Sequence, residues 1–432
     1  MNILVVGSGG REHAICWKLS HSKLVTALYC APGNAGTAAL GTNIPIKATD
    51  VPQLLAFTKK QNIDLTVVGP EAPLAEGIVD AFRAEGMRIF GPTAAAAQLE
   101  TSKAFAKDFM KRHRIPTAAY EVFRTGDEEA VREYLRHAKY PLVLKADGLA
   151  AGKGVVIAQA FDEALLTARE MLSGSAFGAA GTTLVIEEFL TGIEASVFAL
   201  TDGNRFVTLA PAQDHKRILD NDLGKNTGGM GAFAPTPWVP TEILADIKIR
   251  IIKPTIDGMR ADGIPFNGVL FVGLMLTDEG PKVLEYNCRF GDPETQVVLP
   301  LLDYDLASLL HDIAMDNLQL NRVPLHDANA VCVVIASNGY PDAYQTGKAI
   351  AGLDSIDEAA EGVVVFHSGT AMQGKNIVTA GGRVFGVTAL GEDKDFATTI
   401  RIAYNAVNRI RFDGAYYRTD IGKKALSTFH QP

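Results

Sequence analysis

The first 100 residues repeat one pattern that strongly limits the fold: short apolar runs end in loops that carry glycine or proline. The runs cover residues 3–6, 25–29, 65–68 and 88–90, and helical patterns separate them. Short strands that are buried on both faces and alternate with helices are typical of a doubly wound parallel sheet. Ligands of such sheets bind at the carboxyl ends of the strands, so we expect a ligand at these loops.

The rest of the chain divides into two further parts. A strand, a glycine-rich loop, a second strand, a helix and a third strand occupy residues 123–188, which we interpret as an inserted lid. Short strands broken by glycine fill residues 326–432, together with a helix near residues 396–410. A chain of 432 residues fits about three domains. We therefore predict an α/β fold (α+β overall) with domains at 1–101, 102–325 and 326–432.

Composition excludes several classes of function. The net charge of −8 argues against nucleic acid as a partner. No stretch approaches the ~20 apolar residues that a membrane helix needs, and the N-terminal apolar run is too short for a signal peptide. The four cysteines show no CxxC spacing. We expect free thiols in a reducing, cytoplasmic compartment.

The first loop reads Gly7-Ser8-Gly9-Gly10-Arg11-Glu12. It begins like a dinucleotide fingerprint, but the last position, Glu12, should be glycine or alanine, so the match fails. A phosphate can still bind the amides at the start of the following helix, assisted by Arg11. The alternative is a tight turn that needs glycine only for its backbone conformation.

A second glycine-rich loop follows the apolar run 140–145 and reads Lys145-Ala-Asp-Gly-Leu-Ala-Ala-Gly-Lys-Gly154. Its backbone amides can fold over phosphates, with Lys145 reaching them from the strand end. It is not a Walker A motif, because Gly154 stands where serine or threonine should follow Lys153. The alternative is a flexible hairpin with solvated lysines.

Acidic residues end the apolar run 183–189. Glu187 and Glu188 lie at the strand end, and Glu194 follows. Burying two acids is costly unless they find partners, and a nucleoside supplies them. The backbone would then hold the base, and a carboxylate would hold the ribose hydroxyls. The alternative is a solvated strand end.

A fourth motif places Glu285, Asn287 and Arg289 at alternating positions of one strand. Alternation puts the three side chains on one face. A carboxylate and an amide oxygen are hard ligands that suit Mg²⁺, with nucleotide phosphates completing the shell. Arg289 can neutralise a substrate carboxylate or phosphate. The alternative is a ladder of cross-strand ion pairs.

A fifth motif combines Gln213-Asp214-His215-Lys216-Arg217 with a glycine-rich turn, Asn226-Thr227-Gly228-Gly229-Met230-Gly231. Acidic and basic groups stand directly ahead of this turn. A solvated loop would explain the composition equally well.

Together these motifs resemble the phosphoribosylamine–glycine ligase family, which belongs to the ATP-grasp group, over essentially the whole chain. The segments that carry the resemblance are residues 9–14, 31–36, 68–74, 102–105, 145–154, 187–189, 213–217, 226–231 and 289–296. Within the ATP-grasp group, the runs 214–217 and 289–296 are specific to this family. The glycine-rich loop and the Glu285/Asn287 pair are typical of the wider group, so the resemblance makes residues 102–325 an ATP-grasp domain.

The resemblance implies that ATP drives the joining of glycine to 5-phosphoribosylamine through glycyl phosphate, giving glycinamide ribonucleotide for purine synthesis. It implies Mg²⁺ or Mn²⁺ as the metal and allows transient contact with the enzyme that supplies phosphoribosylamine. The expected ATP-binding residues are Lys103, Lys145, Gly152, Gly154, Glu187, Glu188, Leu190 and Glu194. The expected metal ligands are Glu285 and Asn287, and the expected catalytic residues are Arg289, Lys216 and Asp214. The expected substrate-binding residues are Gly9, Gly10, Arg11, Gly33, Asn34, Glu71, Asp292 and Pro293.

Two other functions compete with this interpretation. One is another ATP-grasp ligase, such as a biotin-dependent carboxylase subunit, and the runs 214–217 and 289–296 argue against it. The other is a non-catalytic nucleotide sensor. The presence of Glu285, Asn287 and Lys216 argues against a sensor.

Overall fold

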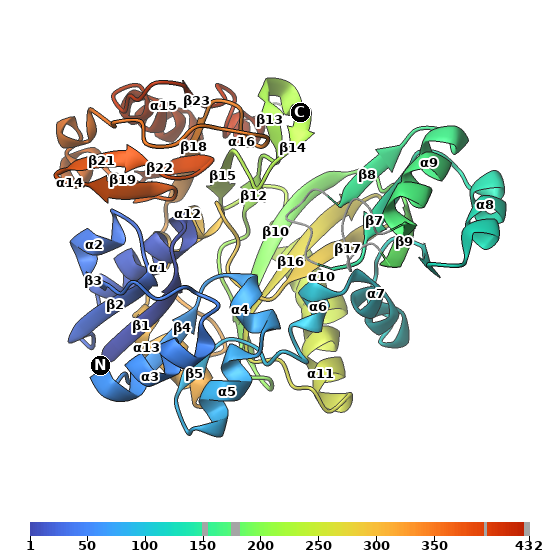
Figure 1. Cartoon of the computed structure of the whole chain (residues 1–432), viewed down its shortest axis with the longest axis horizontal. Helices are drawn as coiled ribbons and strands as arrows, with labels where there is room; N and C mark the ends of the chain where they lie inside the picture. Colours follow the sequence, from blue (N-terminus) through green and yellow to red (C-terminus); the bar gives the residue numbers. More distant parts are fainter. Residues whose placement is uncertain (149–153, 174–181, 393–394, 427–432) are drawn as a thin grey trace.

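The computed structural model describes residues 1–148, 154–173, 182–392 and 395–426. Figure 1 shows an N-terminal α/β part beneath a C-terminal β-rich part, with a central sheet beside them and a lid at the far end. Within the described residues, no helix is both long and apolar enough to cross a membrane.

The N-terminal part is a parallel sheet with the strand order β3-β2-β1-β4-β5. Its strands are β1 (Asn2–Gly7), β2 (Ala27–Pro32), β3 (Thr42–Asn43), β4 (Leu65–Val68) and β5 (Ile89–Phe90). Its helices are α1 (Gly10–Ser20), α2 (Thr37–Leu40), α3 (Val51–Gln61), α4 (Glu71–Ala75) and α5 (Ile78–Ala84). The predicted doubly wound sheet is confirmed. β2 starts later than the apolar run suggested, because its register pairs Asn2 with Ala27 and Gly7 with Pro32.

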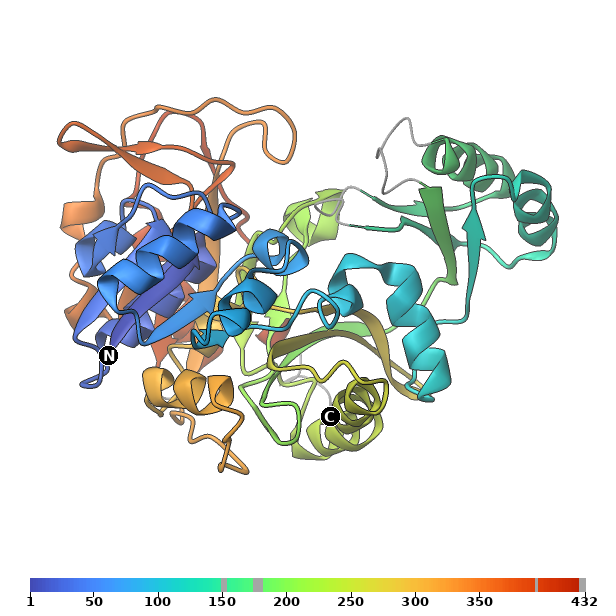
Figure 2. The ribbon, with the colours of Figure 1, turned by 60° about the horizontal axis from the view of Figure 1, so that its bottom comes forward.

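Two helices, α6 (Gln98–Thr101) and α7 (Lys103–Arg112), lead into the lid. The lid is an antiparallel sheet with the order β6-β9-β7-β8, and it buries an apolar face against two helices. Its elements are β6 (Tyr120–Arg124), α8 (Glu128–His137), β7 (Leu142–Ala146), β8 (Val155–Ala158), α9 (Phe161–Leu172) and β9 (Thr183–Glu188). Figure 2 shows the lid standing apart from the N- and C-terminal parts.

The central sheet is antiparallel with the order β11-β10-β16-β17. Its strands are β10 (Ile193–Thr201), β11 (Phe206–Thr208), β16 (Gly268–Thr277) and β17 (Gly280–Asn287). One helical stretch accompanies it, made of α10 (Thr241–Ile247), the π-helix η3 (Lys248–Ile252) and α11 (Lys253–Ala261). Residues of this stretch and of the parallel sheet share one apolar core, which fixes the central sheet relative to the N-terminal loops.

A six-stranded sheet has the order β12-β15-β18-β22-β19, with β23 paired to β18. Its strands are β12 (Gln213–Asp214), β15 (Gly231–Ala234), β18 (Asn329–Ser337), β19 (Val363–His367), β22 (Arg383–Gly391) and β23 (Ala415–Tyr416). It therefore joins strands from both sides of the boundary drawn at residue 325. That boundary stays a prediction.

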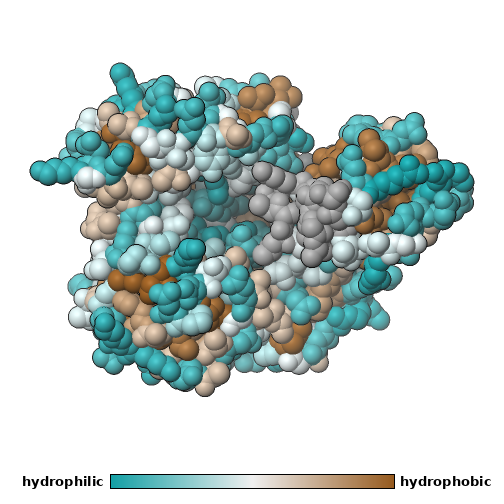
Figure 3. Space-filling view, viewed as in Figure 1, coloured by the Kyte–Doolittle hydropathy of each residue, from teal (hydrophilic) through white to brown (hydrophobic). Residues whose placement is uncertain are grey.

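Smaller elements complete the C-terminal half. They are β13 (Arg217–Leu219), η2 (Asp220–Asp222), β14 (Leu223–Asn226), α12 (Thr295–Val298), α13 (Leu306–Ala314), η4 (Leu353–Ser355), α14 (Glu358–Glu361), β20 (Thr370–Gln373), β21 (Asn376–Thr379), α15 (Phe396–Val407) and α16 (Lys423–Leu426). The predicted helix near residues 396–410 is confirmed as α15. Figure 3 shows a hollow with hydrophilic walls where the N-terminal, central and C-terminal parts meet.

Candidate active site

The predicted metal ligands lie together at the end of β17. Lys216 Nζ is 3.3 Å from Glu194 Oε2 and 3.9 Å from Glu285 Oε1. Burial alone would raise the pKa of Glu285, but Lys216 and two further lysines outweigh it and hold that pKa below its usual value. An ionised carboxylate beside the amide oxygen of Asn287 fits a hard cation. In the part of the chain that the structure describes, no three His, Cys, Asp or Glu side chains are grouped so that they could hold a metal ion.

A buried ion-pair triad stands behind the predicted phosphate lysines. Glu187 is 2% exposed, and its carboxylate lies 2.8 Å from Lys145 Nζ and 2.9 Å from Lys107 Nζ. Burial lowers the pKa of Lys107 to about 8, although Glu187 opposes that shift. Lys103 Nζ donates to the Gly148 carbonyl oxygen at 2.8 Å, at the start of the glycine-rich loop. The Glu187 carboxylate thus positions Lys145, and only the backbone of Glu187 is left for a nucleoside.

Sequence reasoning missed Lys107. The only signal was a lysine placed one helical turn after Lys103, among the apolar residues of α7. The predicted Gly152 lies outside the described residues. Gly154 is buried, and its carbonyl oxygen accepts the Ala146 N–H at 2.9 Å, which anchors the end of the loop.

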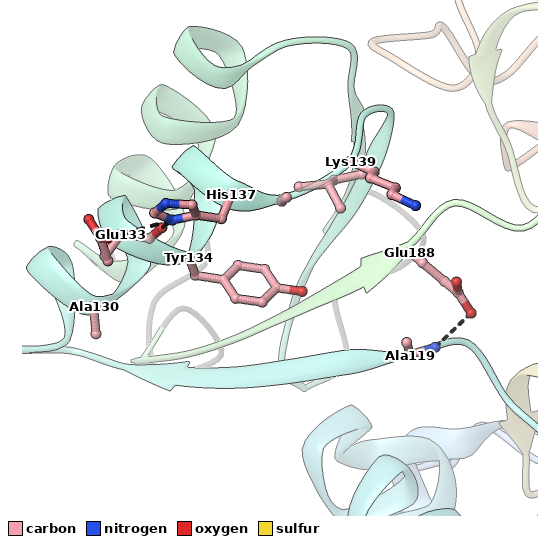
Figure 4. A pocket seen from close by; sticks show the side chains of 9 residues that line it. Ala119, Ala130, Glu133, Tyr134, His137, Lys139 and Glu188 are labelled. Atoms are coloured by element: carbon pink, nitrogen blue, oxygen red, sulfur yellow. Dashed lines mark hydrogen bonds and ion pairs between the residues drawn. The ribbon is translucent and has the colours of Figure 1, made fainter.

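Glu187 and Glu188 point to opposite faces of β9. The Glu188 carboxylate accepts the Ala119 N–H at 2.9 Å and lines a cavity of about 650 Å³ beside α8. Figure 4 shows Tyr134 and His137 of α8 on the other side of this cavity. The cavity lies on the face of the lid sheet away from Lys145. A nucleoside on the Lys145 face would therefore meet the Glu188 backbone, whereas Leu190 (8% exposed) packs against Met275 of the central sheet.

Further acids surround Lys216. Burial raises the pKa of Asp214 to about 7, opposed by Lys216 and reinforced by Glu294, Glu194 and Glu285. Glu194 and the other acids raise the pKa of Lys216, against the effect of burial. Glu294, which the sequence analysis did not single out, accepts the Ser196 hydroxyl at 3.2 Å. The structure thus brings Asp214, Lys216 and Glu285 together, and their catalytic and metal-binding roles stay predictions.

The first N-terminal loop is already occupied by a carboxylate. Glu12, at the third position of α1, accepts the Gly9 N–H and the Arg11 Nε–H, each at 2.5 Å. Arg11 also donates to the Phe290 carbonyl oxygen at 3.1 Å and is 8% exposed. A side chain at Gly69 would collide with Glu12. Binding of a phosphate by Gly9, Gly10 and Arg11 stays a prediction, and the spacing of a capping box could have flagged Glu12.

The side-chain amide of Asn34 also makes its hydrogen bonds within the protein. Its side-chain oxygen accepts the N–H groups of Gly36 and Thr37, and its side-chain nitrogen donates to the carbonyl oxygens of Ser8 and His367 at 2.8 Å each. Gly33 has a left-handed backbone (φ 73°), which favours glycine. The predicted Gly33-Asn34 loop therefore ties the N-terminal sheet to the C-terminal part.

Arg289 connects three parts of the site. Its guanidinium lies 2.9 Å from the Glu100 carboxylate and 3.3 Å from that of Glu71, and it donates to Asn287 Oδ1 at 3.2 Å. Glu100 was not predicted; its carboxylate accepts the Cys288 N–H at 2.7 Å. Arg289 therefore aligns the strand that carries the metal ligands with the loop after β4.

The predicted Asp292-Pro293 turn faces the C-terminal part. The Asp292 carboxylate accepts the Gln296 side-chain amide at 2.8 Å, and its Oδ1 atom lies 3.4 Å from Arg383 Nη1. The same Arg383 atom donates to the carbonyl oxygens of Gly228 and Asp292 at 2.6 and 2.7 Å. A side chain at Gly229 would collide with Pro293. This turn and the glycine-rich turn 226–231 therefore pack together.

Comparison with known proteins defines the class first. The fold matches the biotin carboxylase–ATP analogue complex of Campylobacter jejuni with a TM-score of 0.71 at 14% identity, covering 100% of this chain and 95% of the other. The model of the "Phosphoribosylglycinamide synthetase, ATP-grasp (A) domain" matches residues 101–295. The chain is therefore an ATP-grasp enzyme and an ATP-dependent ligase. In its structure, Lys145 of the lid sheet faces the strand of the central sheet that carries Glu285 and Asn287.

The particular family follows from the full length. The N-domain and C-domain models of the same family match residues 1–100 and 330–424. The phosphoribosylamine–glycine ligase of Chlorobaculum tepidum is 52% identical over 99% of this chain and 100% of that relative. The solved phosphoribosylamine–glycine ligase of Thermotoga maritima has a TM-score of 0.85 at 35% identity, covering 97% of this chain and 100% of the other. The chain belongs to the phosphoribosylglycinamide synthetase family.

Proposed function

We propose that this site joins glycine to 5-phosphoribosylamine, with ATP converted to ADP and phosphate, to give glycinamide ribonucleotide for purine synthesis. The supporting observation is the convergence of Lys145, Lys216, Glu285 and Asn287 between lid and central sheet, in a chain that belongs to this family over its length.

The reaction needs an activated carboxylate. One glycine carboxylate oxygen attacks the γ-phosphorus of ATP, ADP leaves, and glycyl phosphate forms. The amine of phosphoribosylamine then attacks the carbonyl carbon, inorganic phosphate leaves, and the amine loses a proton. The protein forms no covalent bond in this scheme, so its residues act by positioning and by neutralising charge.

The described residues divide this work. Lys145, held by Glu187, and Lys103 would bind ATP phosphates, and Glu285 with Asn287 would hold a divalent ion that shields phosphate charge. Lys216 would neutralise the transferred phosphoryl group, with Asp214 beside it. Arg289 would face the glycine carboxylate. Closure of the lid would exclude water from glycyl phosphate.

The contacts of Glu12 and Asp292 narrow the role proposed for the loop at Gly9 and Gly10. Two carboxylates, those of Glu12 and Asp292, stand at the start of α1, and a further anion there is unfavourable. We therefore propose that the loop at Gly9 and Gly10 meets the amine and ribose of phosphoribosylamine. The 5′-phosphate would lie further along the sheet edge, and Arg11 would serve mainly to hold Glu12.

Release of ADP from ATP tests the function directly. Turnover should require glycine and phosphoribosylamine together, with glycinamide ribonucleotide formed in equal amount. Release that depends on bicarbonate and biotin would indicate a carboxylase, and binding of ATP without turnover would indicate a sensor. We propose Mg²⁺ or Mn²⁺ as the working ion, and repeating the assay with each ion tests which of the two supports turnover.

Two wider features belong to the same proposal. Phosphoribosylamine is labile, so we propose transient contact with the enzyme that supplies it, testable by cross-linking during coupled turnover. The four buried free cysteines agree with a reducing compartment such as the cytoplasm. Fractionation of the producing cells would test that location.

A further inference from the structure

A small hairpin directly follows Lys216. It consists of β13, η2 and β14, and among the described residues these two strands pair only with each other. All four residues of β14 are exposed. The hairpin begins at Arg217, one residue after Lys216, whose ammonium group lies between Glu194 and Glu285. A shift of the hairpin would therefore shift the Lys216 backbone.

The hairpin needs contacts with other segments to keep one conformation. An isolated two-stranded ribbon is marginally stable in water. At its tip, Asn221 and Asp222 both adopt left-handed backbone conformations, with φ of 58° and 54°. Asn and Asp tolerate this conformation better than other residues with side chains, but two in succession still carry a backbone cost that neighbouring groups can offset. Something outside the hairpin must therefore fix it.

The C-terminal segment 416–424 supplies that support. The Arg418 side chain is fully buried and donates to both oxygens of Asp420 at 2.8 and 2.7 Å. The same guanidinium donates to Asp222 Oδ1 and to the Arg217 carbonyl oxygen, each at 3.0 Å. Asp420 in turn accepts the Asn221 N–H at 2.8 Å. Arg418 thus contacts both the first residue of the hairpin and its tip.

Four more contacts join the same two segments. They are the Tyr416 hydroxyl to the Ile218 carbonyl oxygen, the Thr419 N–H and hydroxyl to the Asp220 carboxylate, and the Lys424 ammonium to Asp222. Three carboxylates and two cations therefore interlock, and loss of the central guanidinium would leave the carboxylates repelling one another.

The Lys216 backbone is fixed at the base of this hairpin. Its carbonyl oxygen accepts both the N–H and the hydroxyl of Thr227, each at 2.8 Å. On its other side, the His215 N–H donates to the Gly231 carbonyl oxygen at 2.9 Å. The lysine is thus clamped where the two hairpin strands meet, and a shift of the hairpin would move it.

We propose that Arg418 is a positioning residue: through Asp222, Asp420 and the Arg217 carbonyl oxygen it fixes the hairpin 217–226 and so holds Lys216 Nζ between Glu194 and Glu285. The inference rests on the proposed function for its effect on turnover, but the effect on hairpin order is independent of it. The Arg418 side chain is fully buried, so it would act on the site only through the groups that it contacts.

Asp222→Asn is the sharpest test, because it removes the charge through which the hairpin pairs with Arg418 and Lys424, and it leaves the Arg418–Asp420 pair in place. Glu361→Gln is the matched control: its carboxylate is 33% exposed against 38% for Asp222, and it pairs with Arg409 in the same C-terminal part. Arg418→Lys keeps the charge but cannot reach all four acceptors. It should give an intermediate effect.

Two measurements decide the outcome. Asp222→Asn should lower kcat by about 10- to 100-fold, with KM for ATP nearly unchanged, because misplacing a catalytic group costs that much. It should also speed amide hydrogen exchange across residues 216–226, whereas Glu361→Gln should change neither.

Normal kcat in Asp222→Asn, with an active wild type, would overturn the inference and leave the proposed function standing. If the wild type forms no glycinamide ribonucleotide, the proposed function fails and hydrogen exchange alone decides: an unchanged rate at 216–226 would refute the role of Arg418.

Discussion

Replacing Arg289 by methionine should destabilise the protein far more than loss of a surface charge. Its guanidinium contacts Glu100, whose side chain is 6% exposed, and Glu71, whose side chain is 36% exposed. Methionine fills similar space without charge. Glu100 would keep the hydrogen bond from the Cys288 N–H but would lose its direct ion pair.

The two ion pairs contribute very different amounts. Breaking a buried pair by removing one partner costs about 3–5 kcal/mol, because the remaining charge is stranded. The Glu71 pair is partly solvated and adds roughly 0.2–1 kcal/mol. Burial already raises the pKa of Glu100 beside Arg289, so loss of the arginine would push it further toward the neutral acid. We therefore expect a cost of about 3–5 kcal/mol for Arg289→Met, most of it from Glu100.

A double-mutant cycle with Glu100→Gln measures this directly. Urea unfolding followed by fluorescence of Trp17 and Trp238 reports on the N-terminal and central parts. The double variant has no stranded charge, so it should recover about 2 kcal/mol or more relative to additivity. A cost below about 1 kcal/mol for Arg289→Met, or strict additivity with Glu100→Gln, would refute the reasoning.

Three further predictions follow from the same site. Glu285→Ala should reduce turnover to below about 1% at every Mg²⁺ concentration while circular dichroism stays unchanged, and near-normal rates would exclude it as a metal ligand. Gly154→Val should raise KM for ATP strongly because a β-branched side chain blocks close approach of the loop to phosphates, and unchanged ATP kinetics would mean that the loop does not cover them. Burial lowers the pKa of His215 from 6.5 to about 4, so its contribution to stability is present above pH 6.5 and is lost as pH falls toward 4. His215→Leu should therefore remove about 2 kcal/mol of the destabilisation between about pH 7.5 and pH 5, measured by urea unfolding at both pH values, and an identical pH dependence in wild type and variant would contradict this.

The sequence predicted what depends on local pattern. Apolar runs ending in glycine gave the parallel sheet, and alternation on one strand placed Glu285 beside Asn287. The same reasoning put Lys145 at the end of a strand, and the structure adds that its ammonium group donates to the Leu284 carbonyl oxygen of the central sheet. In each case the information lies within about ten neighbouring residues, where strand periodicity decides which side chains share a face.

The sequence pattern did not predict which distant residues these side chains contact. Lys107 meets Glu187 across 80 positions of the chain, and Arg289 meets Glu100 across 189. Pattern alone cannot say that a polar side chain will be satisfied by its own protein instead of a ligand. Asn34 is an example, since its amide binds backbone groups that include the His367 carbonyl oxygen.

The sheet that contains both β15 and β18 has a consequence for how this enzyme can be divided. β15 pairs with β12 on one side and with β18 on the other, and Phe233 lies in the apolar core built by the C-terminal strands. A chain ending near residue 325 would leave β15 with a bare edge and an uncovered aromatic ring, which is a template for aggregation. The C-terminal part is therefore not a separable domain. Split versions and domain exchanges should not cut the chain near residue 325, and the N-terminal, central and C-terminal parts should be transferred together.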